Sequence, residues 1–552
     1  MAHTDAADVL VAGAGPVGLT AAAELRRRGV SCRIVDRLPA RLMYAKAVGI
    51  QPRTLEIWDR MGLVRAALEA AIVMRGQLVY INGTEVARVD LALPPEVPYH
   101  FAALPQYETE RLLEEYLAGF GTRIERGTEL LSFTQDADGV TARLGTAGGG
   151  QEELRTRYLV GCDGAHSIVR KTLGLSFEGG AFPEEYMLAD VEVDWDLPSG
   201  YGVRAMRRDA DGVVDDLLVC IPLPGRGRYR VSMLVPPELS TAGSADGGGG
   251  DEVAHGLEGG RGPELHHVQA VLDRLAPRRA TASDLRWSSV FRISHRLVDR
   301  YGDGRVFVAG DAAHIHPPTG AQGMNTGIQD AVNLAWKLAL AVEGAAGPGL
   351  LASYDAERRP VGEEVVGRTV RHAAEGVQAD PEDPQTLMLR EAQLLVGYPG
   401  SPIVTPADPA DDGTGPRPGE RAPDCGGLTG DIAAYPLRLF DLLRGRDHML
   451  LLYRDGRHHH GDSAQDLEEL AALARELSDG RMESCVVLAD GPAPPAGLSL
   501  PAYRDSRGEF ARLYGVRGTT AFVVRPDGYL GARIRPLSGP ALAGHLAEIF
   551  HR

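Results

Sequence analysis

Residues 8–36 read DVLVAGAGPVGLTAAAELRRRGVSCRIVD, and this stretch decides the fold that the sequence predicts. Residues 8–12 form a short apolar run typical of a buried strand, and a helical pattern follows the glycine turn and ends at Gly29. Residues 32–36 are again strand-like. A strand, a tight turn, a helix and a second strand form the opening unit of a doubly wound α/β sheet. We therefore expect a Rossmann-like domain.

The glycines of this stretch follow the pattern GxGxxG at Gly13, Gly15 and Gly18. In such a turn the first glycine permits the bend, the second lets backbone N–H groups approach a pyrophosphate, and the third lets the helix pack closely. Asp36 ends the second strand, where a carboxylate can accept a ribose hydroxyl. The sequence predicts a dinucleotide site, although the motif does not separate FAD from NAD and an ordinary glycine turn is the alternative.

A second motif, GDAAHIHPPTGAQGMN, occupies residues 310–325 between a strand-like run and a long helical pattern. Asp311 follows the expected strand, and Pro318, Gly320 and Gly323 leave the backbone with little side-chain cover. The start of a helix presents unpaired N–H groups and a partial positive charge. Such a helix start would stabilise the negative charge of a reduced flavin ring. This segment therefore predicts a flavin cradle.

Two further features of the motifs have competing interpretations. His314 and His316 form an HxH pair that could chelate a metal, but no third ligand stands at metal spacing, and we predict no metal site. The sequence CDGAHS begins at Cys162, where a strand ends in an acidic turn. Asp163 would hold the backbone near the cofactor phosphates, and Arg170 could contact a phosphate. The alternative is a purely structural turn.

Composition excludes several classes of protein. The chain has 552 residues and a formal net charge of -17, which permits several domains and argues against a nucleic-acid groove. Because no apolar run is long enough for a transmembrane helix and the N-terminus does not resemble a signal peptide, we expect a cytoplasmic protein without membrane contact. The five cysteines are widely spread and form no CxxC, which argues against disulfide, zinc and dithiol centres.

The order of the predicted elements indicates three domains. A discontinuous dinucleotide-binding domain would contain an inserted domain with an antiparallel sheet, and a linker would lead to a small α/β domain. Pro52 and Gly62 predict a helix between them in the first domain. The glycine-rich stretch 244–262 predicts a mobile surface loop. The expected boundaries are 1–75, 104–176 and 286–397 for the first domain, 76–103 and 177–285 for the inserted domain, 398–427 for the linker and 428–552 for the last domain.

The motif order GAGPVG, CDGAHS and GDAAHIHPPTG resembles the FAD-dependent aromatic hydroxylases of the para-hydroxybenzoate hydroxylase type. The last domain is similar to the thioredoxin-like tail of phenol hydroxylases and of polyketide-tailoring members, although CxxC is absent. The resemblance implies a Rossmann-like FAD-binding domain interleaved with a substrate domain, and a tail that is structural or dimerising, as in a homodimer. It also implies FAD as bound cofactor, NADPH or NADH as transient reductant, and O2 and a small aromatic molecule as substrates.

The resemblance also implies which residues contact FAD. Pro318 and Gly320 would lie beside the flavin ring, and Lys46 would lie on a mobile flavin loop where many members carry arginine. The small residues Ala45, Ala47 and Gly49 would suit such movement. No side chain is assigned a catalytic role, because the flavin carries the chemistry. The implied cofactor-binding residues are Gly13, Gly15, Gly18, Asp36, Arg37, Lys46, Gln106, Asp163, Asp311, Pro318, Gly320, Gly323, Met324 and Asn325.

The chemistry that the resemblance implies is a monooxygenation. NAD(P)H reduces FAD, O2 forms a flavin C4a-hydroperoxide, and one oxygen atom is transferred to an aromatic carbon. The long chain with its tail favours a polycyclic phenol or quinone of the polyketide type, as in antibiotic biosynthesis, over a single-ring phenol. Baeyer–Villiger oxidation of a polycyclic ketone and a non-redox FAD-binding scaffold are the alternatives. A pyridine-nucleotide dehydrogenase would leave residues 310–325 unexplained.

Overall fold

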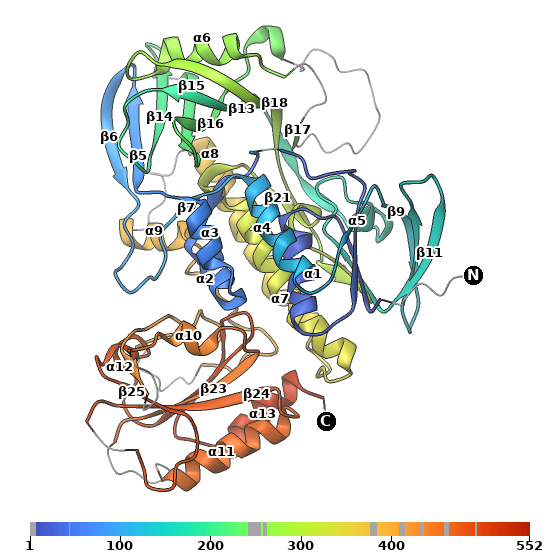
Figure 1. Ribbon diagram of the computed structural model, residues 1–552, viewed down its shortest axis with the longest axis vertical. Coiled ribbons are helices and arrows are strands. Elements are labelled where there is room, and N and C mark those ends of the chain that lie inside the picture. Colours follow the sequence, from blue (N-terminus) through green and yellow to red (C-terminus); the bar gives the residue numbers. More distant parts are fainter. Residues whose placement is uncertain are drawn as a thin grey trace.

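The structure is a computed structural model with a mixed α/β architecture (Figure 1). The expected loop 244–262 lies largely outside the residues that it describes. Within the described part of the chain, no helix is both long enough and apolar enough to cross a membrane. The described residues are 7–43, 45–212, 214–240, 256–257, 262–375, 383–407, 414–430, 435–456, 463–491 and 494–551.

The first sheet has the order β19-β20-β12-β1-β2-β8. Its centre is β1, which pairs in parallel with β2 and with β12, so the predicted strand–helix–strand opening is confirmed. A parallel strand in the centre of a sheet is buried on both faces, and all four residues of β1 are buried. The strands are β1 (Val9–Ala12), β2 (Cys32–Asp36), β8 (Ile124–Arg126), β12 (Tyr158–Gly161), β19 (Gly302–Asp303) and β20 (Val306–Val308).

Helices and two small sheets surround this first sheet. The helix α2 begins at Pro52 and is followed by Gly62 in the left-handed conformation, as the sequence predicts. The helices are α1 (Pro16–Arg27), α2 (Pro52–Met61), α3 (Val64–Ala70), α4 (Gln106–Ala118), α5 (Ile168–Thr172), α7 (Gly323–Glu343), α8 (Ala352–Glu375) and α9 (Pro384–Glu391). The strands of the small sheets are β3 (Gly49–Ile50), β4 (Ile72–Val73), β7 (Ala102–Ala103), β9 (Glu129–Gln135), β10 (Val140–Gly145) and β11 (Gln151–Thr156).

The inserted sheet has the order β17-β18-β13-β16-β15-β14-β5-β6, and β21 pairs with β18. Most neighbouring strands are antiparallel, and α6 (Leu265–Leu275) covers one face of the sheet (Figure 1). Its buried apolar side chains pack in the core on that face. The strand β18 continues past residue 286 to Val298. The strands are β5 (Gly76–Ile81), β6 (Thr84–Asp90), β13 (Phe177–Asp194), β14 (Tyr201–Arg208), β15 (Val214–Pro222), β16 (Arg228–Leu234), β17 (Gly256–Leu257), β18 (Thr281–Val298) and β21 (His314–Ile315).

The C-terminal unit lies at the opposite end of the molecule from α6 (Figure 1). Its sheet has the order β22-β25-β24-β23-β26-β27, in which β25, β24 and β23 are parallel and β26 and β27 form an antiparallel hairpin. The elements are β22 (Leu428–Thr429), β23 (His448–Arg454), β24 (Met482–Leu488), β25 (Ala502–Asp505), β26 (Thr520–Val524), β27 (Leu530–Ile534), α10 (Leu439–Leu443), α11 (Ala464–Leu477), α12 (Glu509–Leu513) and α13 (Gly539–Ile549).

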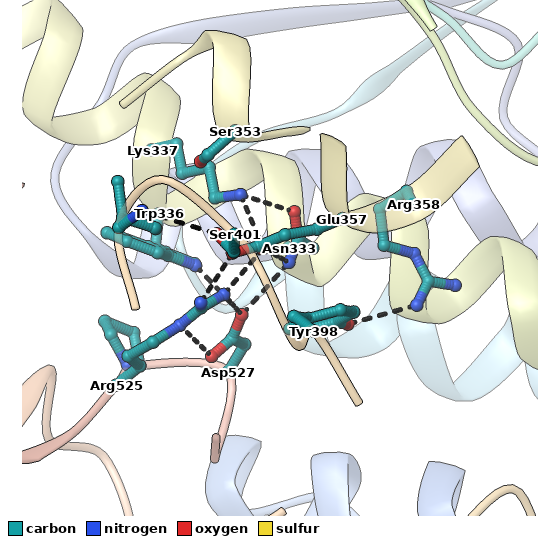
Figure 2. A network of polar contacts seen from close by, with 12 residues as sticks. Asn333, Trp336, Lys337, Ser353, Glu357, Arg358, Tyr398, Ser401, Arg525 and Asp527 are labelled. Atoms are coloured by element: carbon teal, nitrogen blue, oxygen red, sulfur yellow. Dashed lines mark hydrogen bonds and ion pairs between the residues drawn. The ribbon is translucent and has the colours of Figure 1, made fainter. Parts of the chain in front are cut away.

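A buried polar network joins the C-terminal unit to α7 and α8 (Figure 2). The Glu357 carboxylate of α8 accepts two hydrogen bonds from the Arg525 guanidinium, at 2.6 and 2.8 Å. The same carboxylate accepts from the Lys337 ammonium of α7 at 2.8 Å and from the Ser401 hydroxyl at 2.6 Å. Ser401 belongs to the segment expected to be a linker. These contacts anchor that segment and the hairpin tip of the C-terminal unit to the first domain.

Candidate functional site

In the glycine turn after β1, two glycines are closely packed and one faces open space. Gly13 has a φ of +98°, a conformation that favours glycine, and a Cβ there would overlap the Cys162 carbonyl group. A Cβ on Gly18 would overlap the Gly13 carbonyl oxygen. A Cβ on Gly15, by contrast, would meet no described protein atom within 4 Å. Gly13 and Gly18 therefore serve the packing of the turn, whereas the Gly15 face can admit a ligand.

The start of α1 has the properties of an anion site. Gly15 is the N-cap, so no side chain satisfies the first N–H groups of the helix, and Pro16 follows it. Among the described residues, the first turn of α1 holds no acidic side chain. Unsatisfied N–H groups and the helix dipole favour a phosphate at such an end. The geometry therefore fits the pyrophosphate of a dinucleotide.

Asp36 lies at the carboxyl end of β2, beside the glycine turn. Its carboxylate accepts the Ala14 and Leu38 N–H groups, each at 2.8 Å, and lies 3.6 Å from the Arg126 guanidinium. A carboxylate has about four lone-pair sites, so these contacts leave capacity for a hydroxyl donor. The neighbouring Arg37 side chain is exposed. The structure therefore fixes the Asp36 carboxylate at the position where the sequence predicts a ribose contact.

The CDGAHS turn leads into α5 and joins two of the motifs. The Asp163 carboxylate accepts the Ile168 and Val169 N–H groups at 2.8 and 3.2 Å and so holds the backbone of the turn. The Arg170 guanidinium donates to the Ala165 and Ala312 carbonyl oxygens at 2.8 and 3.3 Å. The buried guanidinium therefore contacts backbone carbonyl groups, and its suggested contact with a cofactor phosphate stays a prediction. Arg170 thus ties this turn to the segment after β20.

The two histidines of the 310–325 segment have structural partners. His314 Nε2 lies 2.8 Å from the Asp330 carboxylate, which also accepts the Gly310 N–H and the Arg358 guanidinium. His316 Nδ1 lies 2.9 Å from the Pro317 carbonyl oxygen. Burial lowers the pKa of His316 to about 4, so its ring is neutral at pH 7. Each imidazole therefore positions the backbone of this segment.

The start of α7 is bound tightly to the chain before α2. Gly320 has a φ of +71°, and its carbonyl oxygen accepts the Gln51 amide at 2.5 Å. Asn325 accepts the Gln51 N–H at 3.0 Å and donates to the Gly49 carbonyl oxygen at 2.9 Å. Asn325 is therefore a structural bridge within the expected flavin cradle. No described side chain caps this end of α7, and its first described turn holds no acid, which again suits negative charge.

The segment 45–49, which we call the flavin loop, lies between α7 and the inserted sheet. Lys46 Nζ is 3.6 Å from the Asp311 carboxylate and 5.5 Å from the centre of the Phe291 ring of β18. Gln106, at the start of α4, accepts the Ala47 N–H at 3.3 Å. The structure therefore brings the flavin loop, Gln106 and Asp311 together, although they lie far apart in the sequence.

Gln106 also contacts a residue that the sequence did not single out. Its amide donates to the Glu110 carboxylate at 2.9 Å. Burial raises the pKa of Glu110 to about 7, so this carboxyl group titrates near neutrality beside the flavin loop. A hydrogen bond from Gln106 favours the ionised form and opposes this rise.

Several other residues of the site were not predicted. Gln51, Asp330 and Arg358 form hydrogen bonds between segments that are far apart in the sequence, and no local sequence pattern identifies these residues. The sequence feature that could identify such residues is a polar side chain in a helix that is otherwise apolar and buried, because buried polar groups need hydrogen-bond partners. In α7 these residues are Asn325, Thr326, Gln329, Asp330, Asn333 and Lys337.

Comparison with known proteins decides the family. The family model described as "FAD binding domain" matches residues 6–369, about two thirds of the chain. The chain belongs to this family. This chain is 32% identical to a flavin-dependent monooxygenase of Mycobacteroides abscessus, over 98% of this chain and 99% of that protein. It is 34% identical to the anhydrotetracycline monooxygenase of Streptomyces rimosus, over 96% of each chain.

A solved structure extends the comparison to a complex. Aklavinone-11 hydroxylase, solved as a ternary complex with FAD and aklavinone, superposes with a TM-score of 0.75 at 25% identity, over 99% of each chain. These relatives and the family match establish this chain as an FAD-dependent monooxygenase of the aromatic hydroxylase type. The open Gly15 face and the uncapped starts of α1 and α7 fit FAD.

Proposed function

We propose that this monooxygenase hydroxylates a polycyclic phenol or quinone of the polyketide type, with NADPH or NADH as reductant and O2 as oxidant. The observation that carries the proposal is the meeting of the flavin loop, the uncapped start of α7 and one face of the inserted sheet. The relatives support the substrate class, since one is named for anhydrotetracycline and another was solved with aklavinone.

The chain would hold FAD along the path of its motifs. Gly13, Gly15 and Gly18 with the start of α1 would receive the pyrophosphate, and Asp36, with Arg37 beside it, the ribose of the ADP part. When bound, FAD supplies hydride acceptance and oxygen activation. The residues nearer the ring would be Lys46, Gln106, Asp163, Asp311, Pro318, Gly320, Gly323, Met324 and Asn325.

The protein's own contribution is orientation and electrostatics. The N–H groups at the start of α7 would stabilise negative charge on the pyrimidine end of the flavin. Pro317 is buried and the loop around Gly320 is packed against Gln51, so this segment approaches a ligand with backbone rather than with side chains. Exclusion of water by the sheet and the flavin loop would protect the reacting centre.

We extend the proposal to the domain organisation. The first domain would comprise 1–75, 104–176 and 286–397, the substrate domain 76–103 and 177–285, and a linker 398–427 would precede the tail. The mixed sheet of residues 428–552 supports a thioredoxin-like tail without CxxC. Its role would be structural or dimerising.

The test is NAD(P)H consumption by the FAD-loaded protein with a panel of polycyclic phenols, quinones and ketones under ¹⁸O2. The proposal expects consumption stimulated by substrate and a product that gains one labelled oxygen atom on an aromatic carbon. Insertion of the oxygen beside a ketone would instead establish Baeyer–Villiger oxidation. A flavin that oxidises NAD(P)H at the same rate with and without every compound, and forms no product, would contradict a redox role.

A further inference from the structure

One face of the inserted sheet carries two arginines that form no ion pair with an acidic side chain in the described part of the chain. Strand register places Arg204 of β14 opposite Val219 of β15, and Val219 opposite Ser232 of β16. Arg230 is two residues before Ser232, so Arg204 and Arg230 lie on the same face. The alternate residues, such as Val231, form the core under α6 on the other face. The two arginines therefore lie on the face that α6 does not cover.

This face is the one that the flavin loop covers. Ile221 lies opposite Arg230 in the sheet register and shares its face. Ile221 and Trp287 pack against Ala45 and Val48 of the flavin loop. The arginines and the predicted flavin position are therefore on the same side of the sheet.

Among the residues that the structure describes, the buried guanidinium of Arg230 forms no ion pair with a carboxylate. The residue is 8% exposed, its Nη1 donates to the Ser232 hydroxyl, and its Nε has no hydrogen-bond partner among the described residues. Arg204 Nε is likewise without a partner in the described part of the chain. Burial lowers the pKa of Arg230 to about 10 and also lowers the pKa of Arg204.

A third arginine of the same sheet shows the contrast. Arg228, at the start of β16, lies 3.2 Å from the Asp190 carboxylate and 2.6 Å from the Asp284 carboxylate. Buried charges in proteins are normally paired in this way, because an unpaired buried charge is costly. No carboxylate lies within ion-pair distance of Arg204 or Arg230 among the described residues, so their guanidinium donors can serve a ligand.

The surroundings of the arginines are apolar and aromatic. Leu188, Phe291 and Ile293 form a buried cluster on β13 and β18, against which Tyr186 and Trp287 pack. Flat apolar surfaces of this kind suit the faces of aromatic rings, and a few polar groups then fix the orientation of the ligand. The face thus combines a ring-binding wall with two cations.

We propose that Arg204 and Arg230 bind an anionic oxygen group of the aromatic substrate, so that the enzyme selects rings carrying a carboxylate or an ionised enol. The inference rests on the proposed hydroxylase function only in calling this ligand the substrate. One strand separates β14 from β16, so the two backbones lie about 10 Å apart and both side chains can reach one group. A guanidinium fork matches paired oxygen atoms, which a neutral ring does not offer.

The experiment compares 1-hydroxy-2-naphthoate with its methyl ester, which removes the charge and keeps the rings. Equilibrium dialysis against the FAD-loaded protein gives both dissociation constants. We expect the native enzyme to bind the acid about ten- to a hundredfold more tightly than the ester. Arg204→Met and Arg230→Met should each weaken acid binding about tenfold or more and change ester binding by less than about twofold. The matched control is Arg207→Met, since Arg207 is an exposed arginine of the same strand paired with Asp215.

The outcomes separate this inference from the proposed function. Equal affinity of the native enzyme for acid and ester, or an equal loss in the Arg207 variant, would overturn the inference. If Arg230→Met does not fold, the inference is tested with Arg204→Met and Arg230→Lys. The Arg230→Lys variant should bind the acid with intermediate affinity. Charge-selective binding without oxygenated product would refute the proposed oxidation alone. Oxygenation of the acid with unchanged efficiency in both arginine variants would refute this inference alone.

Discussion

At the scale of single residues, Gly18 and Gly15 of the first turn serve different purposes, since one is needed for stability and the other for FAD binding. Gly18→Ala would press a methyl group into the Gly13 carbonyl oxygen, so we expect a loss of about 1–3 kcal/mol in the free energy of unfolding. Gly15→Ala adds its methyl group to open space at an ordinary φ of −77°, so we expect the stability of the apoprotein to change by less than about 0.5 kcal/mol. FAD affinity should nevertheless fall. Thermal unfolding of the apoprotein and FAD titration measure the two effects, and native FAD affinity in Gly15→Ala would contradict our placement of the pyrophosphate.

A second residue-scale prediction concerns His448 in the C-terminal unit. Burial lowers the pKa of His448 to about 3, and its ring packs against Trp336 and Phe550. Below pH 6.5 the unfolded chain binds a proton that the folded protein does not, so stability is lost as the pH falls from 6.5 towards 3. His448→Phe removes this loss and should gain about 1.4 kcal/mol per pH unit relative to the native protein in that window. Unfolding midpoints of both proteins from pH 7.5 to 4.5 measure the difference, and parallel curves would show that the ring is accessible to protons.

At the scale of elements, α7 connects the flavin cradle to the rest of the molecule. Its Asp330 holds Gly310, His314 and Arg358, all buried. Asp330→Asn would leave the Arg358 charge without its partner, so we expect a loss of about 3–5 kcal/mol in stability together with weaker FAD binding. Glu343→Gln, at the exposed end of the same helix, is the control and should change neither quantity. Unfolding by urea and FAD titration are the measurements, and native behaviour of Asp330→Asn would remove Asp330 from the support of the cradle.

The elements themselves show what a sequence can predict. The strand–helix–strand opening and the ends of α2 follow from local signals, since hydrophobic period, proline at a helix start and glycine after its end act over a few residues. The hydrogen bonds of Asn325 to residues 49–51 could not be predicted, because partners so far apart in the chain leave no local pattern. The motif placed Asn325 in the site, but only the structure shows that it holds the backbone together.

At the scale of the whole molecule, the start of the segment predicted to be a linker, 398–427, is anchored by buried contacts. Proline, glycine and aspartate in 398–427 indicate the absence of helices and strands, but they do not exclude buried contacts. The Tyr398 hydroxyl oxygen accepts a hydrogen bond from the Arg358 guanidinium at 3.1 Å, and the Ser401 hydroxyl donates to the Glu357 carboxylate. The C-terminal unit is therefore coupled to the helices that carry the flavin cradle, and irregular backbone provides part of the coupling.

This coupling can be measured with a double-mutant cycle on Arg525 and Glu357, whose buried charges meet between the C-terminal unit and α8 (Figure 2). Arg525→Met alone should lower the free energy of unfolding by about 3–5 kcal/mol, because the buried Glu357 carboxylate then lacks one of its cationic partners. Glu357→Gln alone should cost a similar amount, because Arg525 and Lys337 then both lose the buried carboxylate that they share. The double variant should cost less than the sum of the two single losses by about 1–3 kcal/mol. Additive losses would mean that the pair is not coupled, and the C-terminal unit would then be attached through other contacts, which include the Arg444–Asp59 ion pair and the apolar contacts with Trp336 and Leu340.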